Sequence, residues 1–272
     1  MSKQQVNKKK QFSGLWGIIL GGSSGFGFAA IKKLAHHGMN IAVLYRETGA
    51  ADKTLREYLG ELAEKSEVSI LPFNSNALDE KERTMFIQQF TSSVDKKKCV
   101  RMLLHSIARG NLKPLAGEES AEILSAEDIQ YTTYAMSTSL LDWTRSLLNE
   151  DLFCKDAGII GLTSEGAHRY WDSYTAVSIA KASLESLSTY MAVEFSRYGL
   201  RTNLIQAGIT ATPSLKRIPK SENLIELATK RNPMGRITLP EDVANVIYLL
   251  CTDEASWING SLIHVDGGEH CR

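Results

Sequence analysis

Seven short, almost uninterrupted apolar runs alternate with longer segments of helical spacing, and this alternation constrains the fold more than any other feature. The runs lie at residues 15–20, 41–45, 68–72, 99–105, 158–163, 202–206 and 261–265. Continuous hydrophobicity, as in IAVLY at 41–45, is typical of parallel strands that helices cover on both faces. The sequence therefore predicts an α/β Rossmann fold, a doubly wound parallel sheet of about seven strands with helices on both faces.

A single core can account for almost the whole chain, because 272 residues with 43% hydrophobic content bury one large α/β core. We expect a disordered basic tail over residues 1–13 and one domain over residues 14–272. Residues 207–239 follow a predicted strand and contain three of the six prolines. Ligands of open α/β sheets bind beyond the carboxyl ends of the strands, so this segment is predicted to be an irregular lid over a substrate.

Charge and cysteine content exclude several classes of protein. The 31 basic and 31 acidic residues give a net charge of zero, so nothing draws the whole molecule to nucleic acid or to an anionic membrane. The basic N-terminus is followed by no apolar run long enough for membrane insertion. The four cysteines and six histidines show no metal-ligand spacing, so we expect no metal site. A cytoplasmic protein is the natural interpretation.

A glycine-rich segment joins the first predicted strand to the first predicted helix. Its spacing, Gly-x3-Gly-x-Gly from Gly21 to Gly27, allows the backbone to approach a pyrophosphate, and the helix N-terminus behind it supplies free N–H groups. A side chain at the glycine positions would collide with the phosphate or strain the turn. A dinucleotide is therefore predicted to bind against Gly21, Ser23, Ser24, Gly25, Phe26 and Gly27.

The end of the second predicted strand bears on which dinucleotide is bound. A carboxylate at this point binds the ribose 2′-hydroxyl of NADH, whereas a basic residue pairs with the 2′-phosphate of NADPH. The sequence has Arg46 followed by Glu47. Arg46 favours NADPH, and the adjacent Glu47 leaves NADH possible.

A tyrosine and a lysine seven residues apart follow the fifth predicted strand. Tyr174 and Lys181 would be nearly in phase on a helix, separated by about 10 Å of rise. A lysine near a phenol favours the phenolate and can hold a nicotinamide ribose, so Tyr174 is suited to hydrogen-bond a substrate carbonyl. The alternative, a core tyrosine and a solvated lysine, is the weaker interpretation in a chain that already has the glycine-rich loop.

These motifs together resemble the short-chain dehydrogenase/reductases from one end of the chain to the other. The runs His-Ser-Ile-Ala at 105–108 and Val-Asp-Gly-Gly at 265–268 match that pattern as the glycine-rich loop does. Most members have Tyr-x3-Lys, whereas Val177 stands four residues before Lys181 here. The Tyr-x6-Lys spacing is similar instead to the bacterial enoyl-acyl-carrier-protein reductases. Among these the chain resembles the FabL-type, NADPH-preferring enzymes more than the FabI-type, which have a second tyrosine where this chain has Ser164.

The resemblance implies roles for individual residues. Tyr174 would bind the thioester carbonyl and the enolate that forms when hydride reaches the β-carbon, and Lys181 would bind the nicotinamide ribose. Ser164 stands where ordinary dehydrogenases have their catalytic serine, so it either assists at the substrate oxygen or caps the strand. Further contacts are expected from Tyr170, Trp171 and Arg109 at the substrate, and from Asn76, Ala77, Ser106, Ile107, Ala108, Gly208, Thr210 and Thr212 at the cofactor.

Residues 135–139 contain no asparagine, although carbonyl-reducing members carry one midway along this helix to feed a proton relay. Enoyl reduction needs only transient stabilisation of an enolate oxygen, so the absence favours it. We therefore expect NADPH-dependent reduction of an enoyl thioester on acyl carrier protein or coenzyme A, in fatty acid or specialised acyl metabolism. A carbonyl reductase or alcohol dehydrogenase of the same fold and a non-catalytic dinucleotide-binding protein are the alternatives.

Two further expectations concern partners. Amphipathic segments at 127–149 and 174–198 resemble the helices through which this family forms dimers and tetramers, so a homotetramer or homodimer is expected. Basic residues in the expected lid either meet an acidic carrier or coenzyme A phosphates, or are plain surface charge. They are Lys216, Arg217, Lys220, Lys230 and Arg231.

Overall fold

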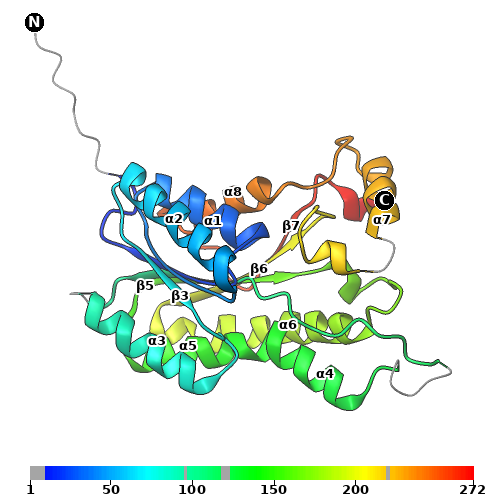
Figure 1. The fold of residues 1–272 in the computed structure, drawn as a ribbon, viewed down its shortest axis with the longest axis horizontal. Coiled ribbons are helices and arrows are strands. Elements are labelled where there is room, and N and C mark those ends of the chain that lie inside the picture. Colours follow the sequence, from blue (N-terminus) through cyan, green and yellow to red (C-terminus); the bar gives the residue numbers. More distant parts are fainter. Residues whose placement is uncertain (1–9, 95–96, 118–122, 219–220) are drawn as a thin grey trace, which may run out of the picture.

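A seven-stranded parallel sheet forms the centre of the molecule, with helices on both faces (Figure 1). The computed structural model describes residues 10–94, 97–117, 123–218 and 221–272. The strands follow the order β3-β2-β1-β4-β5-β6-β7, and each neighbouring pair is parallel. The doubly wound α/β fold predicted from the sequence is therefore confirmed.

The strands coincide closely with the predicted apolar runs, except at β3 and β5. They are β1 (Trp16–Leu20), β2 (Asn40–Tyr45), β3 (Ile70–Asn74), β4 (Val100–His105), β5 (Phe153–Thr163), β6 (Leu200–Ala207) and β7 (Leu262–Val265). The strand predicted at 68–72 is shifted, because the N–H of Val68 bonds to the carbonyl of Ala63 and so belongs to the preceding helix end. Strand β5 begins at Phe153 rather than at residue 158.

Helices α1, α2 and α8 cover one face of the sheet, and α3, α4, α5 and α6 cover the other, while α7 lies beyond the sheet beside the C-terminus (Figure 1). Their bounds are α1 (Gly25–His36), α2 (Gly49–Ser66), α3 (Glu80–Ser93), α4 (Ala126–Thr133), α5 (Ser139–Asn149), α6 (Thr175–Glu194), α7 (Ser221–Arg231) and α8 (Pro240–Leu250). A π-helical turn (Tyr134–Thr138) separates α4 from α5, so the segment expected at 127–149 is not one regular helix. No helix in the described ranges is long and apolar enough to cross a membrane.

Successive strand residues enter two different cores, which explains the continuous hydrophobicity of the strands. Ile19 and Val43 pack into the core beneath α1 and α8, whereas their neighbours Ile18 and Leu44 pack into the core beneath α3 and α5. Side chains alternate between the two faces of a strand, so a sheet covered on both faces favours apolar residues at successive positions.

The domain begins earlier than predicted. Phe12 is buried, its ring centroid lies 5.7 Å from that of Tyr248 on α8, and its N–H donates to the carbonyl of His37. The prediction of a disordered tail through residue 13 is therefore wrong for residues 10–13, because Phe12 completes the core beneath α1 and α8. Residues 1–9, the rest of that predicted tail, lie outside the described residues.

The segment at 207–239 is more regular than predicted. It contains α7 and a short 3-10 turn at Leu215–Arg217. Leu215, Ile218 and Ala228 are buried in one apolar cluster with residues of α6. The expectation of an irregular stretch is therefore wrong, and the segment packs on the molecule through its own small core.

Candidate active site

A cavity of about 500 Å³ opens at the carboxyl ends of the strands, where β1 and β4 lie side by side although β2 and β3 come between them in the chain. Doubly wound sheets bind ligands at this kind of crevice. Of the residues predicted to bind the cofactor, all but Gly27 line the cavity. Of those predicted to border the substrate, Trp171 and Arg109 line it and Tyr170 does not.

Two glycines of the loop after β1 allow close backbone packing. A Cβ at Gly21 would lie 2.4 Å from the carbonyl oxygen of Ser106, and one at Gly27 would lie 2.2 Å from the carbonyl oxygen of Gly21. Gly21 also has a φ of +88°, which L side chains rarely adopt. Gly27 does not line the cavity, but its lack of a side chain lets the first turn of α1 pack directly against the backbone of Gly21.

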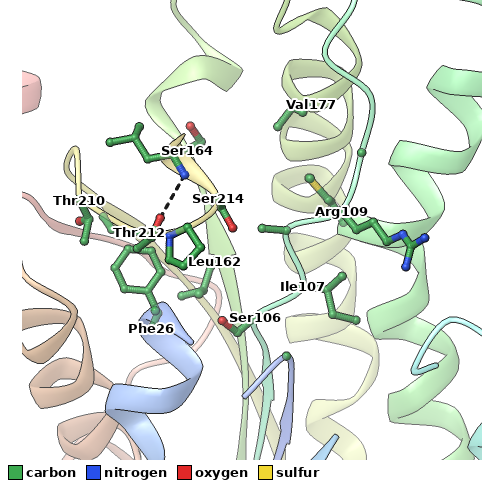
Figure 2. A pocket seen from close by; sticks show the side chains of 18 of the residues that line it. Phe26, Ser106, Ile107, Arg109, Leu162, Ser164, Val177, Thr210, Thr212 and Ser214 are labelled. Atoms are coloured by element: carbon green, nitrogen blue, oxygen red, sulfur yellow. Dashed lines mark hydrogen bonds between the residues drawn. The ribbon is translucent and has the colours of Figure 1, made fainter. Parts of the chain in front are cut away.

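The start of α1 presents unsatisfied backbone donors to the cavity. Ser24 makes no side-chain capping bond, and no acidic residue stands in the first turn of the helix. Such a helix start favours an anion through its free N–H groups and its dipole. In Figure 2, Phe26 at this helix start and Thr212 from the segment after β6 face one another. A pyrophosphate fits this cradle, since side chains are excluded where the loop turns.

The cavity wall at the end of β2 holds a cation whose side chain is unpaired among the described residues. Arg46 is exposed, lines the cavity, and makes no hydrogen bond or ion pair with any residue that the structure describes. Glu47 lines the same wall, and its backbone exchanges two hydrogen bonds with the side chain of Asn74. The basic side chain is therefore available to a ligand phosphate, with one carboxylate beside it.

The loop after β3 is held by its own polar groups. The backbone N–H of Asn76 donates to Glu82, its side-chain oxygen accepts from the N–H of Leu78, and the carbonyl of Ala77 accepts from the indole of Trp143 at 2.7 Å. Asn76 and Ala77 therefore form a firm wall of the cavity.

Tyr174 occupies the N-cap position of α6 and points its hydroxyl at Ser164. The hydroxyl donates to Ser164 Oγ at 3.3 Å, and the N–H of Gly166 donates to the same oxygen at 3.2 Å. Gly166 also gives the tyrosine ring its space, because a Cβ there would lie 2.5 Å from a ring carbon. Ser164 therefore caps the turn after β5 and also contacts Tyr174, while its role at a substrate oxygen stays a prediction.

The surroundings of Tyr174 favour its protonated form. Burial raises the pKa of Tyr174, and the hydrogen bond with Ser164 opposes this only in part. The expectation that Lys181 favours the phenolate stays a prediction. Tyr174 is therefore a protonated phenol at neutral pH, suited to donate a hydrogen bond.

Lys181 lies about two turns after the N-cap of α6 and is almost fully buried. Its Nζ donates to the carbonyl of Leu162 at 2.7 Å, which turns the ammonium toward the end of β5. Burial lowers the pKa of Lys181 to about 8, and the charge of Glu185 opposes the fall. The buried ammonium lines the cavity and is suited to hold a polar group of a ligand.

Tyr170 lies outside the site. Its side chain is 88% exposed and does not line the cavity, whereas Trp171 turns inward and its ring centroid lies 4.9 Å from that of Tyr174. Ser173 has a φ of +56°, and this left-handed turn sets the direction of the segment that enters α6. The prediction that Tyr170 borders the substrate is therefore wrong.

The π-helical turn places a methionine thioether at the cavity wall, in the stretch 135–139 that contains no asparagine. Met136 from this turn lines the wall. The turn is anchored by Ser139, whose hydroxyl donates to the carbonyl of Ala135 and therefore accepts from Nε2 of His105 at 2.8 Å. Burial lowers the pKa of His105 to about 3, so its imidazole is neutral.

The inner part of the cavity is apolar. Met136, Tyr174, Val177, Ile209 and Leu215 form one cluster, with Trp171 packed against it. Val177 faces this region from α6 (Figure 2). An acyl or other hydrocarbon group fits this lobe, with the phenol of Tyr174 at its edge.

Comparison with known proteins agrees with this geometry. A family model described as enoyl-(acyl carrier protein) reductase matches residues 21–270. The chain belongs to the enoyl-(acyl carrier protein) reductase family. The family lies within the short-chain dehydrogenase/reductases, which are oxidoreductases with a nicotinamide dinucleotide cofactor.

The relatives and the solved structure that match this chain have names that state different activities and cofactors. FabI of Aquifex aeolicus, an NADH-dependent enoyl-acyl-carrier-protein reductase, is 30% identical over 249 residues, which cover 89% of this chain and 86% of its own. A tropinone reductase homolog of Arabidopsis thaliana is 27% identical over 266 residues, which cover 97% and 96%. The structure of the Bacillus cereus enoyl-acyl carrier protein reductase with NADP+ and an indole naphthyridinone superposes with a TM-score of 0.83, at 24% identity, over 97% of this chain and 99% of that one.

The sequence pointed to Arg231 as a basic residue of the 207–239 segment, but it did not indicate the two carboxylates with which this residue pairs. Nη2 of Arg231 on α7 lies 2.7 Å from a carboxylate oxygen of Glu165 and 2.6 Å from one of Glu269. Arg231 is therefore a strap between the 207–239 segment, the turn that carries Ser164, and the C-terminus. Of the other lid cations, Lys230 pairs with Glu226, Lys216 and Arg217 are exposed, and Lys220 lies outside the described residues.

Proposed function

We propose that this protein is an NADPH-dependent reductase that transfers hydride to the β-carbon of a 2,3-unsaturated acyl thioester. The observation that carries the proposal is the placement of Tyr174, a protonated phenol at the N-cap of α6, seven residues before Lys181 and at the edge of an apolar lobe. In a ketone the carbon that accepts hydride is bonded directly to the oxygen, whereas two further bonds separate them in an enoyl thioester. A phenol moved toward the start of the helix suits the longer separation.

The chemistry requires the side chains to stabilise an enolate oxygen. A bound nicotinamide cofactor would supply the hydride to the β-carbon. Tyr174 would turn its proton from Ser164 to the thioester oxygen as negative charge develops there, and the hydroxyl of Ser164 would then donate to the phenol oxygen and hold it in place. The α-carbon would then take a proton from water, which completes addition of two hydrogens. Preorganised donors of this kind are worth several kcal/mol, about 100-fold or more in rate.

The proposed preference for NADPH depends on Arg46. Its guanidinium is unpaired among the described residues and lines the adenosine side of the cavity. A bidentate guanidinium is suited to a phosphate. Lys181 would hold the nicotinamide ribose, and Thr210, Thr212 and the loop from Gly21 would enclose the pyrophosphate and carboxamide.

The proposed substrate is a thioester on acyl carrier protein or coenzyme A. Arg109 and Arg217 line the cavity, and neither guanidinium has a hydrogen bond or ion pair with any described residue. Figure 2 shows Arg109 extending away from Phe26 and Thr212, so it is directed away from the cofactor loop. Both guanidinium groups are thus available to carrier phosphates, while the apolar lobe would take the acyl chain.

Carbonyl reduction is the second candidate. The hydrogen bond between Tyr174 and Ser164 is the arrangement that a ketone reductase would use at a carbonyl oxygen, and the tropinone reductase homolog matches over almost the whole chain. The wall at Met136 speaks against it, because a thioether supplies no polar site for a proton relay.

Product analysis tests the proposed reaction. The protein is incubated with a trans-2-enoyl thioester and NADPH that carries deuterium in the transferable position, and the product is analysed by mass spectrometry and NMR. We expect the saturated thioester with one deuterium on the β-carbon. Recovery of unreacted enoyl thioester, together with conversion of a ketone under the same conditions, would support the second candidate instead.

A further inference from the structure

Three consecutive residues at the end of β5 bind three side chains that belong to α6. The carbonyl of Leu162 accepts from Lys181 at 2.7 Å, and Ser164 Oγ accepts from Tyr174 at 3.3 Å. Between them, the hydroxyl of Thr163 donates to Oε1 of Glu185 at 2.6 Å. The middle contact uses a residue that takes no part in the proposed chemistry.

Glu185 lies one helical turn after Lys181, and both of its carboxylate oxygens are held. Oε1 accepts from Thr163, and Oε2 lies 2.7 Å from Nε2 of His168. The Glu185 side chain is 19% exposed, whereas that of His168 is 59% exposed. Residues four apart on a helix lie on one face, so the carboxylate and the ammonium of Lys181 share the side that faces β5.

Lys181 has few charged neighbours besides Glu185. His105 on β4 also faces it, but the pKa of His105 lies at about 3, so that ring is neutral at working pH. Burial lowers the pKa of Lys181 to about 8, and Glu185 is the group that opposes this. Without the carboxylate, desolvation would act on the ammonium unopposed by a nearby negative charge.

We propose that Glu185 is a positioning residue that acts through Lys181: fixed by Thr163 and His168, its carboxylate keeps the buried ammonium charged, while the carbonyl of Leu162 directs it at the end of β5. The inference rests on the proposed role of Lys181 in binding the nicotinamide ribose. An uncharged lysine amine donates a weaker hydrogen bond to the ribose hydroxyls than an ammonium does. Cofactor affinity would then fall at a lower pH than in the native protein.

The experiment measures the dissociation constants of NADPH and NADH from pH 6 to pH 9 in the full chain, by calorimetry or by protein fluorescence. Glu185→Gln keeps the shape of the side chain and removes its charge. Glu194→Gln removes the same charge from an exposed position of the same helix and serves as the matched control. Thr163→Val is a second variant, which leaves the charge and releases one of its two anchors.

We expect Glu185→Gln to bind like the native protein near pH 6 and about three- to tenfold more weakly near pH 9, because a pKa lower by up to one unit reduces the charged fraction up to tenfold. Thr163→Val should weaken binding at high pH in the same way but by a smaller factor. Glu185→Asp should recover part of the affinity that Glu185→Gln loses. Glu194→Gln should bind the cofactors as the native protein does at every pH. Superimposable profiles for Glu185→Gln and the native protein would overturn the inference.

Lys181→Met separates this outcome from the proposed function. If Lys181→Met weakens the cofactor at every pH and Glu185→Gln has no effect, only the positioning role is wrong. If Lys181→Met binds the cofactor as the native protein does, the proposed role of Lys181 fails and the inference fails with it. Because the readout is binding, it does not depend on which substrate is reduced.

Discussion

The hydroxyl of Tyr174 lies 3.3 Å from Oγ of Ser164, and that same oxygen also accepts the N–H of Gly166. The serine oxygen therefore fixes the phenol from one side and the turn after β5 from the other. The phenol oxygen is therefore held in a defined place before any substrate binds, and only its proton has to turn from Ser164 to a substrate oxygen.

Tyr174→Phe should reduce kcat by about 100-fold or more, because it removes the hydroxyl that would donate to developing negative charge and leaves the ring in place. Tyr170→Phe is the matched control, since this side chain is exposed and lies outside the cavity. Steady-state rates of both variants show which tyrosine supplies the phenol needed for turnover. Loss of activity in Tyr170→Phe, with Tyr174→Phe intact, would mean that the phenol has been assigned to the wrong residue.

Ser164→Ala should reduce kcat by about two- to tenfold, corresponding to one hydrogen bond of about 0.5–1.5 kcal/mol, with little change in KM. The effect is smaller than that of Tyr174→Phe because the serine acts by orienting the phenol. Kinetics and unfolding by urea are measured on the same preparation. A variant that loses stability but keeps its full kcat would restrict Ser164 to capping the turn.

Arg46→Ala should weaken NADPH about tenfold and leave NADH nearly unchanged, because the guanidinium would meet only the 2′-phosphate. Glu47→Gln should shift the preference further toward NADPH, since it removes the neighbouring negative charge. Dissociation constants for both cofactors provide the test. An unchanged ratio in Arg46→Ala would make Arg46 a solvated side chain.

Arg231→Gln should lower the free energy of unfolding by about 1–3 kcal/mol and expose the 207–239 segment to proteases, because Glu165 and Glu269 lose their shared cation. Loss of the cation should cost more at Glu269 than at Glu165, because the Glu269 side chain is only 2% exposed and an unpaired buried carboxylate is unfavourable. Lys230→Gln, on the exposed side of the same helix, should cost less than about 0.5 kcal/mol. Equal free energies of unfolding for the two variants would show that the ion pairs of Arg231 do not stabilise the protein.

Predictions from the sequence were most successful where structure is set by local pattern. The strands are mostly apolar on both faces, so they stood out as runs, and their order along the chain fixed the doubly wound fold. The glycine-rich loop and the pair Tyr174 and Lys181 could be found because their spacing is constrained by one turn and one helix. The cavity indeed brings these elements together.

The errors have physical causes that a sequence does not display. Tyr170 and Tyr174 differ in direction because Ser173 adopts a left-handed conformation, which serine rarely signals. The contacts of Arg231 with Glu165 and Glu269 join residues 66 and 38 positions apart, and no periodicity connects them. Phe12 belongs to the core although it follows a polar, basic stretch, because its partner Tyr248 lies near the other end of the chain.

The most direct test of the proposed function compares two substrates of equal chain length with the native protein and NADPH. A short trans-2-enoyl thioester and the matching 3-ketoacyl thioester are supplied at equal concentrations, and oxidation of the cofactor is followed by its absorbance. We predict that the enoyl thioester is turned over much faster, because Tyr174 is placed for an oxygen two bonds further from the carbon that receives hydride. Faster turnover of the 3-ketoacyl thioester would contradict the enoyl reductase assignment.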